Sequence, residues 1–106
     1  MNRLVLKAEK NTTFNERLFH VSTNGMPIDL TDWIIEMQLK ETFESEPINI
    51  GISITDPTNG YFKINTFVPD YFGNYIFDIK MIDSNGKIVR YIKGNFIISN
   101  TVTDGN

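Results

Sequence analysis

Large apolar residues alternate with mostly polar residues along two stretches of the chain, 33–40 and 75–82. The apolar side chains at every second position are Trp33, Ile35, Met37 and Leu39 in the first stretch, and Tyr75, Phe77, Ile79 and Met81 in the second. A period of two residues is the signature of a β-strand that buries one face. The pattern therefore predicts two strands whose apolar faces share one core.

Three turn signals separate the apolar stretches. They are Asn24-Gly25, Asp56–Gly60 and Asp83–Gly86, which are rich in residues that tolerate positive φ or bond to their own backbone. Each predicts a hairpin, and the segments expected to pair are 16–22 with 26–30, 48–54 with 61–65, and 75–82 with 87–93. Further strands are expected at 4–8 and at 96–99, the latter continuing 87–93 after a bulge at Gly94.

No segment has the sustained 3.6-residue period of a helix, and the polar stretch 41–47 predicts a crossover loop. Many short strands without helices for parallel crossovers are typical of antiparallel sandwiches. The predicted fold class is all-β, an antiparallel immunoglobulin-like β-sandwich of about seven to eight strands.

Two aromatic residues favour the immunoglobulin-like form of this sandwich. Immunoglobulin domains carry a tryptophan on the third strand, and a tyrosine two residues before the cysteine of the sixth strand. Trp33 opens the predicted third strand, and the segment 70–77 resembles the corner sequence, with Tyr75 as the corner tyrosine and Phe77 at the cysteine position. The alternative for Tyr75 is a place in the core without a corner role.

Length, charge and composition bear on the number of domains and on the kinds of partner. The chain has 106 residues, which predicts a single domain over 1–100 followed by a polar tail over 101–106. The net charge is −3 with scattered basic residues, so nucleic acid is not expected as a partner. There is no cysteine and no apolar run long enough for a bilayer, so we expect no membrane partner and folding in a reducing cytoplasm.

Candidate chemistry is sparse, and we expect no catalytic, cofactor-binding or metal-binding residues and no enzyme activity. His20 is the only histidine and has no neighbouring thiol, which favours a structural role. The turn Asp83–Gly86 offers oxygen ligands but lacks the downstream glutamate of a calcium loop, which favours a plain hairpin turn. The carboxylates of Glu41, Glu44 and Glu46 form an acidic patch that is either solvated or in contact with a basic partner.

An aromatic-rich segment, residues 67–72, is the candidate interaction loop. Phe67, Tyr71 and Phe72 flank a proline, and exposed aromatic side chains offer large, rigid contact areas. In the alternative arrangement Phe67 and Phe72 cap the end of the sandwich and only Tyr71 is exposed.

The order of these features resembles small bacteriophage virion domains, a group that includes N-terminal domains of baseplate proteins and head or tail accessory subunits. The resemblance is carried by the turn 25–31, the strand 73–78, the turn 83–86 and the last strand 87–96. It implies a structural accessory role in the virion, by capsid decoration or by attachment to the tail, baseplate or fibres. The expected partners are other virion proteins, bound through edge strands and the termini 1–9 and 100–106, with a homo-oligomer or symmetric array strengthening weak contacts.

A rival hypothesis is a free ligand-binding sandwich for host-surface carbohydrate. It would use Tyr61, Tyr71 and Tyr91 as stacking platforms.

Overall fold

The computed structural model describes residues 4–100, which form an all-β molecule with one short 3₁₀ turn. The elements are β1 (Leu4–Glu9), β2 (Arg17–His20), β3 (Ser22–Thr23), β4 (Met26–Pro27), β5 (Ile34–Lys40), β6 (Ile48–Ile50), β7 (Ile52–Asp56), η1 (Pro57–Asn59), β8 (Tyr61–Ile64), β9 (Gly73–Ile82) and β10 (Ile88–Ser99). The predicted all-β class is confirmed.

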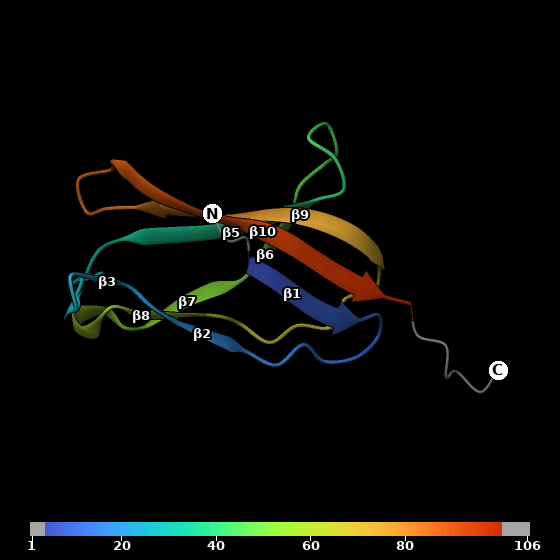
Figure 1. Ribbon diagram of the computed structural model, residues 1–106, viewed down its shortest axis with the longest axis horizontal. Helices are drawn as coiled ribbons and strands as arrows, with labels where there is room; N and C mark the ends of the chain where they lie inside the picture. The colour runs from blue at the N-terminus through green and yellow to red at the C-terminus, as the bar shows by residue number, and fades with distance from the viewer. Residues whose placement is uncertain (1–3, 101–106) are drawn as a thin grey trace.

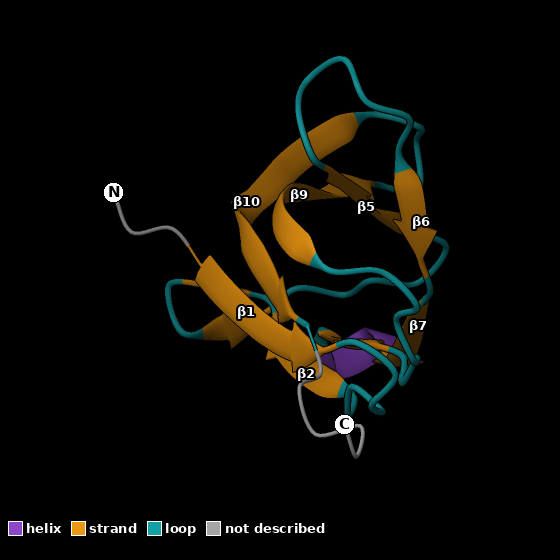
Figure 2. Cartoon of the chain, turned by 90° about the vertical axis from the view of Figure 1, so that its right-hand side faces the viewer, coloured by secondary structure: helices purple, strands orange, loops and turns teal. Residues whose placement is uncertain are grey.

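Two sheets form the layers of the molecule (Figure 1). The larger has the strand order β1-β10-β9-β5-β6 and the smaller the order β2-β8-β7, while β3 and β4 form a separate two-stranded ribbon. The end-on view in Figure 2 places β10, β9, β5 and β6 opposite β2 and β7.

One pairing departs from the predicted antiparallel arrangement. The strand β1 runs parallel to β10, with Leu4 opposite Gly94 and Glu9 opposite Ser99, whereas the other strand pairs are antiparallel. After β1 the chain crosses to β2 in the other sheet, so β1 has no hairpin partner of its own. It lies instead beside the last strand, and the larger sheet is mixed.

The two predicted alternating strands supply the centre of the core. Ile35, Met37 and Leu39 of β5 are buried, and their register places them opposite the buried residues of β9. Together with residues from the facing sheet they form one apolar cluster, and its buried members are Leu6, Val21, Leu30, Ile35, Met37, Leu39, Ile50, Phe62, Ile64, Tyr75, Phe77, Ile79, Met81, Phe96 and Ile98. The shared core expected from the alternation is confirmed.

The three predicted turns are present. Asn24 and Gly25 both have positive φ, 54° and 80°, in the ribbon of β3 and β4, and Gly60 closes η1 with φ 78°. In the hairpin between β9 and β10, the Asp83 carboxylate accepts hydrogen bonds from the backbone N–H groups of Asn85 and Lys87 at 2.9 and 3.0 Å. The first hairpin is shorter than expected, because β2 pairs with β8 and not with 26–30.

The segment 48–54 is not one strand. The chain changes sheets at Gly51, so that β6 pairs with β5 in the larger sheet and β7 pairs with β8 in the smaller one. The crossover is therefore made at this glycine. The loop 41–47, expected to be the crossover, instead joins two neighbouring strands of the same sheet.

The predicted bulge at Gly94 is also wrong. The strand β10 passes through Gly94 without interruption, and its register shifts near the other end, between Ile88 and Arg90. A side chain at position 94 would collide with the carbonyl oxygen of Leu4 and the ring of Phe77. This glycine is required by the close approach of β1, not by a bulge.

Candidate interaction surfaces

The predicted interaction loop divides between the core and the surface. Phe67 packs against the core, with its ring 5.3 Å from that of Phe14 and 6.1 Å from that of Phe96. Backbone hydrogen bonds between Phe14 and Phe67 in both directions, at 2.7 and 3.3 Å, fix this contact. Phe67 therefore closes the end of the molecule and is not available as an exposed anchor.

The other two residues of this loop exchange the positions expected in the alternative arrangement. Tyr71 is half-buried and packs edge-on against Tyr75 with ring centroids 5.6 Å apart, whereas Phe72 is 51% exposed with the Lys10 ammonium 5.6 Å from its ring. Val68 is exposed beside them, and Pro69 is buried. The surface of this loop thus consists of Phe72 and Val68.

Tyr75 and Phe77 belong to β9, and both lie in the core of the molecule. The hydroxyl of Tyr75 donates a hydrogen bond to the upstream carbonyl of Phe72 at 3.3 Å, and the Phe77 ring lies 6.4 Å from that of Phe96. Burial raises the pKa of both Tyr71 and Tyr75 above the usual value, because the ionised phenolate loses solvation there.

Trp33 does not reach the centre of the core. It immediately precedes β5 and is half-buried, at the same end of the molecule as the hairpin between β9 and β10. Its side chain lines a hollow of about 170 Å³ whose other lining residues are Val21, Ile28, Met81, Val89 and Arg90.

The most exposed large apolar side chain among residues 4–100 belongs to Phe43, which is 86% exposed at the tip of the loop 41–47. The loop projects beyond the larger sheet (Figure 1). Phe43 was not predicted to be an interaction residue, because the stretch 41–47 is polar overall. The signal present in the sequence was a single phenylalanine between glutamates, with no apolar partner at strand or helix spacing.

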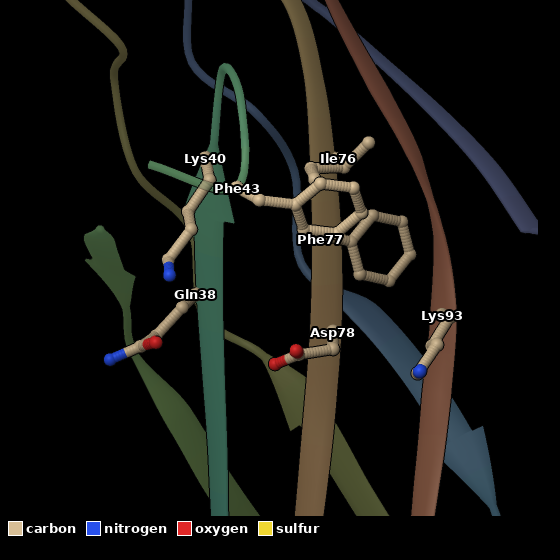
Figure 3. A pocket seen from close by; sticks show the side chains of 7 residues that line it. All are labelled: Gln38, Lys40, Phe43, Ile76, Phe77, Asp78 and Lys93. Carbon is tan, nitrogen blue, oxygen red and sulfur yellow. The ribbon is translucent and has the colours of Figure 1, made fainter. Parts of the chain in front are cut away.

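Phe43 overhangs a hollow of about 230 Å³ on the outer face of the larger sheet. Figure 3 shows Phe43 extending from its loop toward Ile76 of β9, with Gln38, Asp78 and Lys93 on three adjacent strands below. The hollow is lined by Gln38, Lys40, Phe43, Ile76, Phe77, Asp78 and Lys93.

Polar cross-strand rows build this outer face. In one row Glu36 faces Lys80, which faces Tyr91, and the Lys80 ammonium lies 3.4 Å from the Glu36 carboxylate. In the next row Gln38 faces Asp78, which faces Lys93. Charges of both signs alternate across the strands, so the face carries no strong field of one sign.

The three tyrosines of the carbohydrate hypothesis do not form one platform. Tyr91 lies on the outer face of the larger sheet, and Tyr61 lies on β8 of the smaller sheet with the exposed His20 ring stacked 4.5 Å from its own. Tyr71 packs on Tyr75 in the connection before β9. Each tyrosine thus belongs to a different surface.

Ionisable groups are dispersed over the surface. Within residues 4–100 no three histidine, cysteine or acidic side chains gather as a metal-ligand set, and no helix there is long and apolar enough to cross a membrane. Hydrogen bonds from the Thr31 hydroxyl and backbone N–H hold the pKa of Asp29 below its usual value. The carboxylate of Asp83 serves its own turn.

The termini contribute one described element. The strand β1 forms the edge of the larger sheet, and the rest of the predicted terminal contact segments, 1–3 and 101–106, lies outside the described residues.

No protein-family model matches the chain, and comparison with curated proteins gives no match.

Proposed function

We propose that this chain is an immunoglobulin-like structural accessory domain of a bacteriophage virion, made in the host cytoplasm, that acts through contacts with other virion proteins. The virion setting follows from the resemblance of its turns and last strands to small virion domains. The mode of action follows from the surface described above.

The strand order supports the immunoglobulin-like part of the proposal. The order β10-β9-β5-β6 corresponds to strands G, F, C and C′ of a variable-type domain, and β2-β8-β7 corresponds to B, E and D. In this correspondence Tyr75 lies near the start of strand F, two residues before Phe77, and its hydroxyl bonds to upstream backbone as a corner tyrosine does.

The observation that carries the binding function is the exposure of Phe43. Aromatic side chains are enriched among residues that dominate protein interfaces, because they bury a large area with little loss of conformational freedom. Most phenylalanines of this chain pack into the core, yet Phe43 is held 86% exposed on a projecting loop. A partner surface that covers it would gain the free energy of burying a full aromatic ring.

Carbohydrate binding is the second candidate, and one local feature favours it. A second hollow on the outer face of the larger sheet, of about 220 Å³, is lined by Glu36, Gln38, Asp78, Lys80 and Tyr91. Carboxylate and amide groups beside an aromatic ring can bond the hydroxyls and stack on the face of a sugar.

Mass spectrometry of purified particles from the source tests the proposal. Detection in many copies per particle supports a capsid decorator, and a handful of copies supports a position in the tail, baseplate or fibres. Absence of the chain from particles, combined with specific binding of one sugar on a glycan array, would replace the virion proposal by the carbohydrate-binding one.

A further inference from the structure

Two features of the surface are complementary and lie too far apart to meet within one molecule. Phe43 follows the carboxyl end of β5, and the hollow beside Trp33 lies at the amino end of the same strand. A strand of this length spans about 23 Å, at about 3.3 Å per residue. Phe43 can therefore enter such a hollow only on another copy of the chain.

The turn that carries Phe43 is fixed by hydrogen bonds at its base. The Ser45 N–H donates to the Thr42 carbonyl at 3.1 Å, the Thr42 N–H donates to the Ser45 hydroxyl at 3.0 Å, and the two hydroxyls lie 3.0 Å apart. The Glu44 N–H also donates to the Thr42 hydroxyl at 3.3 Å. Because the turn is ordered before any partner arrives, little conformational freedom remains to be lost on binding.

The hollow beside Trp33 has the size and lining of a site for one aromatic ring. Its volume is about 170 Å³, and five of its six lining residues are apolar. An apolar cavity of about 150 Å³ accommodates benzene. It lies where β10 is uncovered, since β1 pairs with β10 only from Gly94 onward.

Charge on the two sides is also complementary. Glu41, Glu44 and Glu46 flank Phe43 on its loop, whereas Arg90 is the one charged residue that lines the hollow. Among residues 4–100 the Arg90 guanidinium makes no ion pair, so it is available to a carboxylate from outside.

We propose that Phe43 of one copy inserts into the hollow lined by Trp33, Val89 and Arg90 on a second copy. The contact is head-to-tail, so each copy has one donor and one acceptor surface, and repetition generates a ring or a filament. This self-association goes beyond the virion role and can be measured on the isolated protein.

Sedimentation equilibrium of the full chain provides the first test, and we expect the average mass to rise with concentration. Phe43→Ala removes the inserted ring, and Val89→Trp fills the hollow from its exposed rim, so either should weaken association roughly 30-fold or more. Phe72→Ala, on the other exposed aromatic loop, is the matched control and should leave association unchanged.

Mixing the two defective variants tests whether Phe43 and the hollow meet across copies. The Val89→Trp copy retains Phe43 and the Phe43→Ala copy retains the hollow, so their mixture should form one-to-one heterodimers and nothing larger. A symmetric dimer built from the same contact would be partly restored in the mixture as well, but its unmodified chain would stop at the dimer, whereas the head-to-tail contact allows larger assemblies. Near-ultraviolet circular dichroism checks that Val89→Trp is folded, and Arg90→Glu, which reverses the charge at the hollow, is the second variant.

Trp33 is the only tryptophan and lines the hollow, so its fluorescence reports occupancy directly. The emission should change with concentration in the unmodified chain and not in Phe43→Ala. The proposal is overturned if the unmodified chain stays monomeric up to its solubility limit, if both variants still associate normally, or if the mixture yields no heterodimer.

Discussion

Two loops of this molecule each carry a phenylalanine, and the structure buries one of these side chains and exposes the other. The segment 65–72 connects β8 of the smaller sheet to β9 of the larger one, so it must cross the end of the core. Its phenylalanine at position 67 closes that end. The loop 41–47 connects β5 to β6 within the larger sheet, and its phenylalanine at position 43 lies over the outer face of that sheet and is 86% exposed.

The difference teaches that topology decides whether a loop has a core beneath it in which an aromatic ring can be buried, as Phe67 is, although Phe72 on the same segment is exposed. A connection between facing sheets brings some of its side chains over the core, where burial of a ring is favourable. A connection between neighbours in one sheet has no core beneath it. An aromatic residue there contributes little to the stability of the isolated chain and remains available for a contact with another molecule.

The largest expected effect is a difference in the free energy of unfolding between variants of the two phenylalanines. Phe67→Ala should lower the free energy of unfolding by about 3 kcal/mol, because it removes a ring that packs on Phe14 and Phe96. Phe43→Ala should change it by less than about 0.5 kcal/mol, because the ring has little of its surface buried. Urea denaturation measures both, and equal losses for the two variants would contradict the comparison.

The next effect tests the close approach of β1 to β10. Gly94→Ala should destabilise the fold by about 2 kcal/mol, since the added methyl group collides with the backbone of Leu4 and the ring of Phe77. Hydrogen exchange should then show loss of protection in β1 and the adjoining half of β10. Gly51→Ala is the matched control, because its methyl group would meet only the flexible side chain of Asn65.

A smaller effect concerns the hydrogen bond that anchors the segment before β9. Tyr75→Phe removes the bond from the hydroxyl to the Phe72 carbonyl and should cost about 0.5 to 1 kcal/mol. Tyr91→Phe, at an exposed position on the outer face, should cost nothing measurable. Thermal unfolding of the two variants gives the comparison, and an equal shift in both would show that the Tyr75 hydroxyl has no anchoring role.

The smallest effect is a dependence of stability on alkaline pH. Burial raises the pKa of Tyr71 and Tyr75 above 10.0 in the folded chain, so folding favours their protonated forms. This contribution is complete below the unfolded pKa and is lost as the pH rises through the folded pKa. Denaturation midpoints should fall above about pH 10, and less so in the double variant Tyr71→Phe/Tyr75→Phe. An equal fall in both proteins would mean that other groups cause it.

Local pattern predicted the elements better than their partners. The alternation in β5 and β9 and the turns at Asn24-Gly25 and Asp83–Gly86 depend on neighbouring residues alone, so the sequence is sufficient to identify them. The change of sheet at Gly51 and the parallel pairing of β1 depend on residues far apart in the chain. No short-range signal encodes them.

The candidate site was harder to predict for the same reason. The segment 67–72 was predicted to be an interaction loop, but which of its rings face the core depends on Phe14 and Phe96, which lie far away in sequence. Phe43 was missed because its exposure is a consequence of the loop joining neighbouring strands. The glycine at position 94 was assigned to a bulge because the close approach of Leu4 is not visible in the sequence.

Hydroxyl-radical footprinting of the phenylalanines, in the free chain and in purified particles, tests the central claim most directly. Phe43 should be oxidised rapidly in the free chain at a concentration low enough to keep it monomeric and be protected in particles, whereas Phe67 should be protected in both. Rapid oxidation of Phe67 in the free chain, or equal oxidation of Phe43 in both states, would contradict the claim that the two loops have divided structural and binding roles.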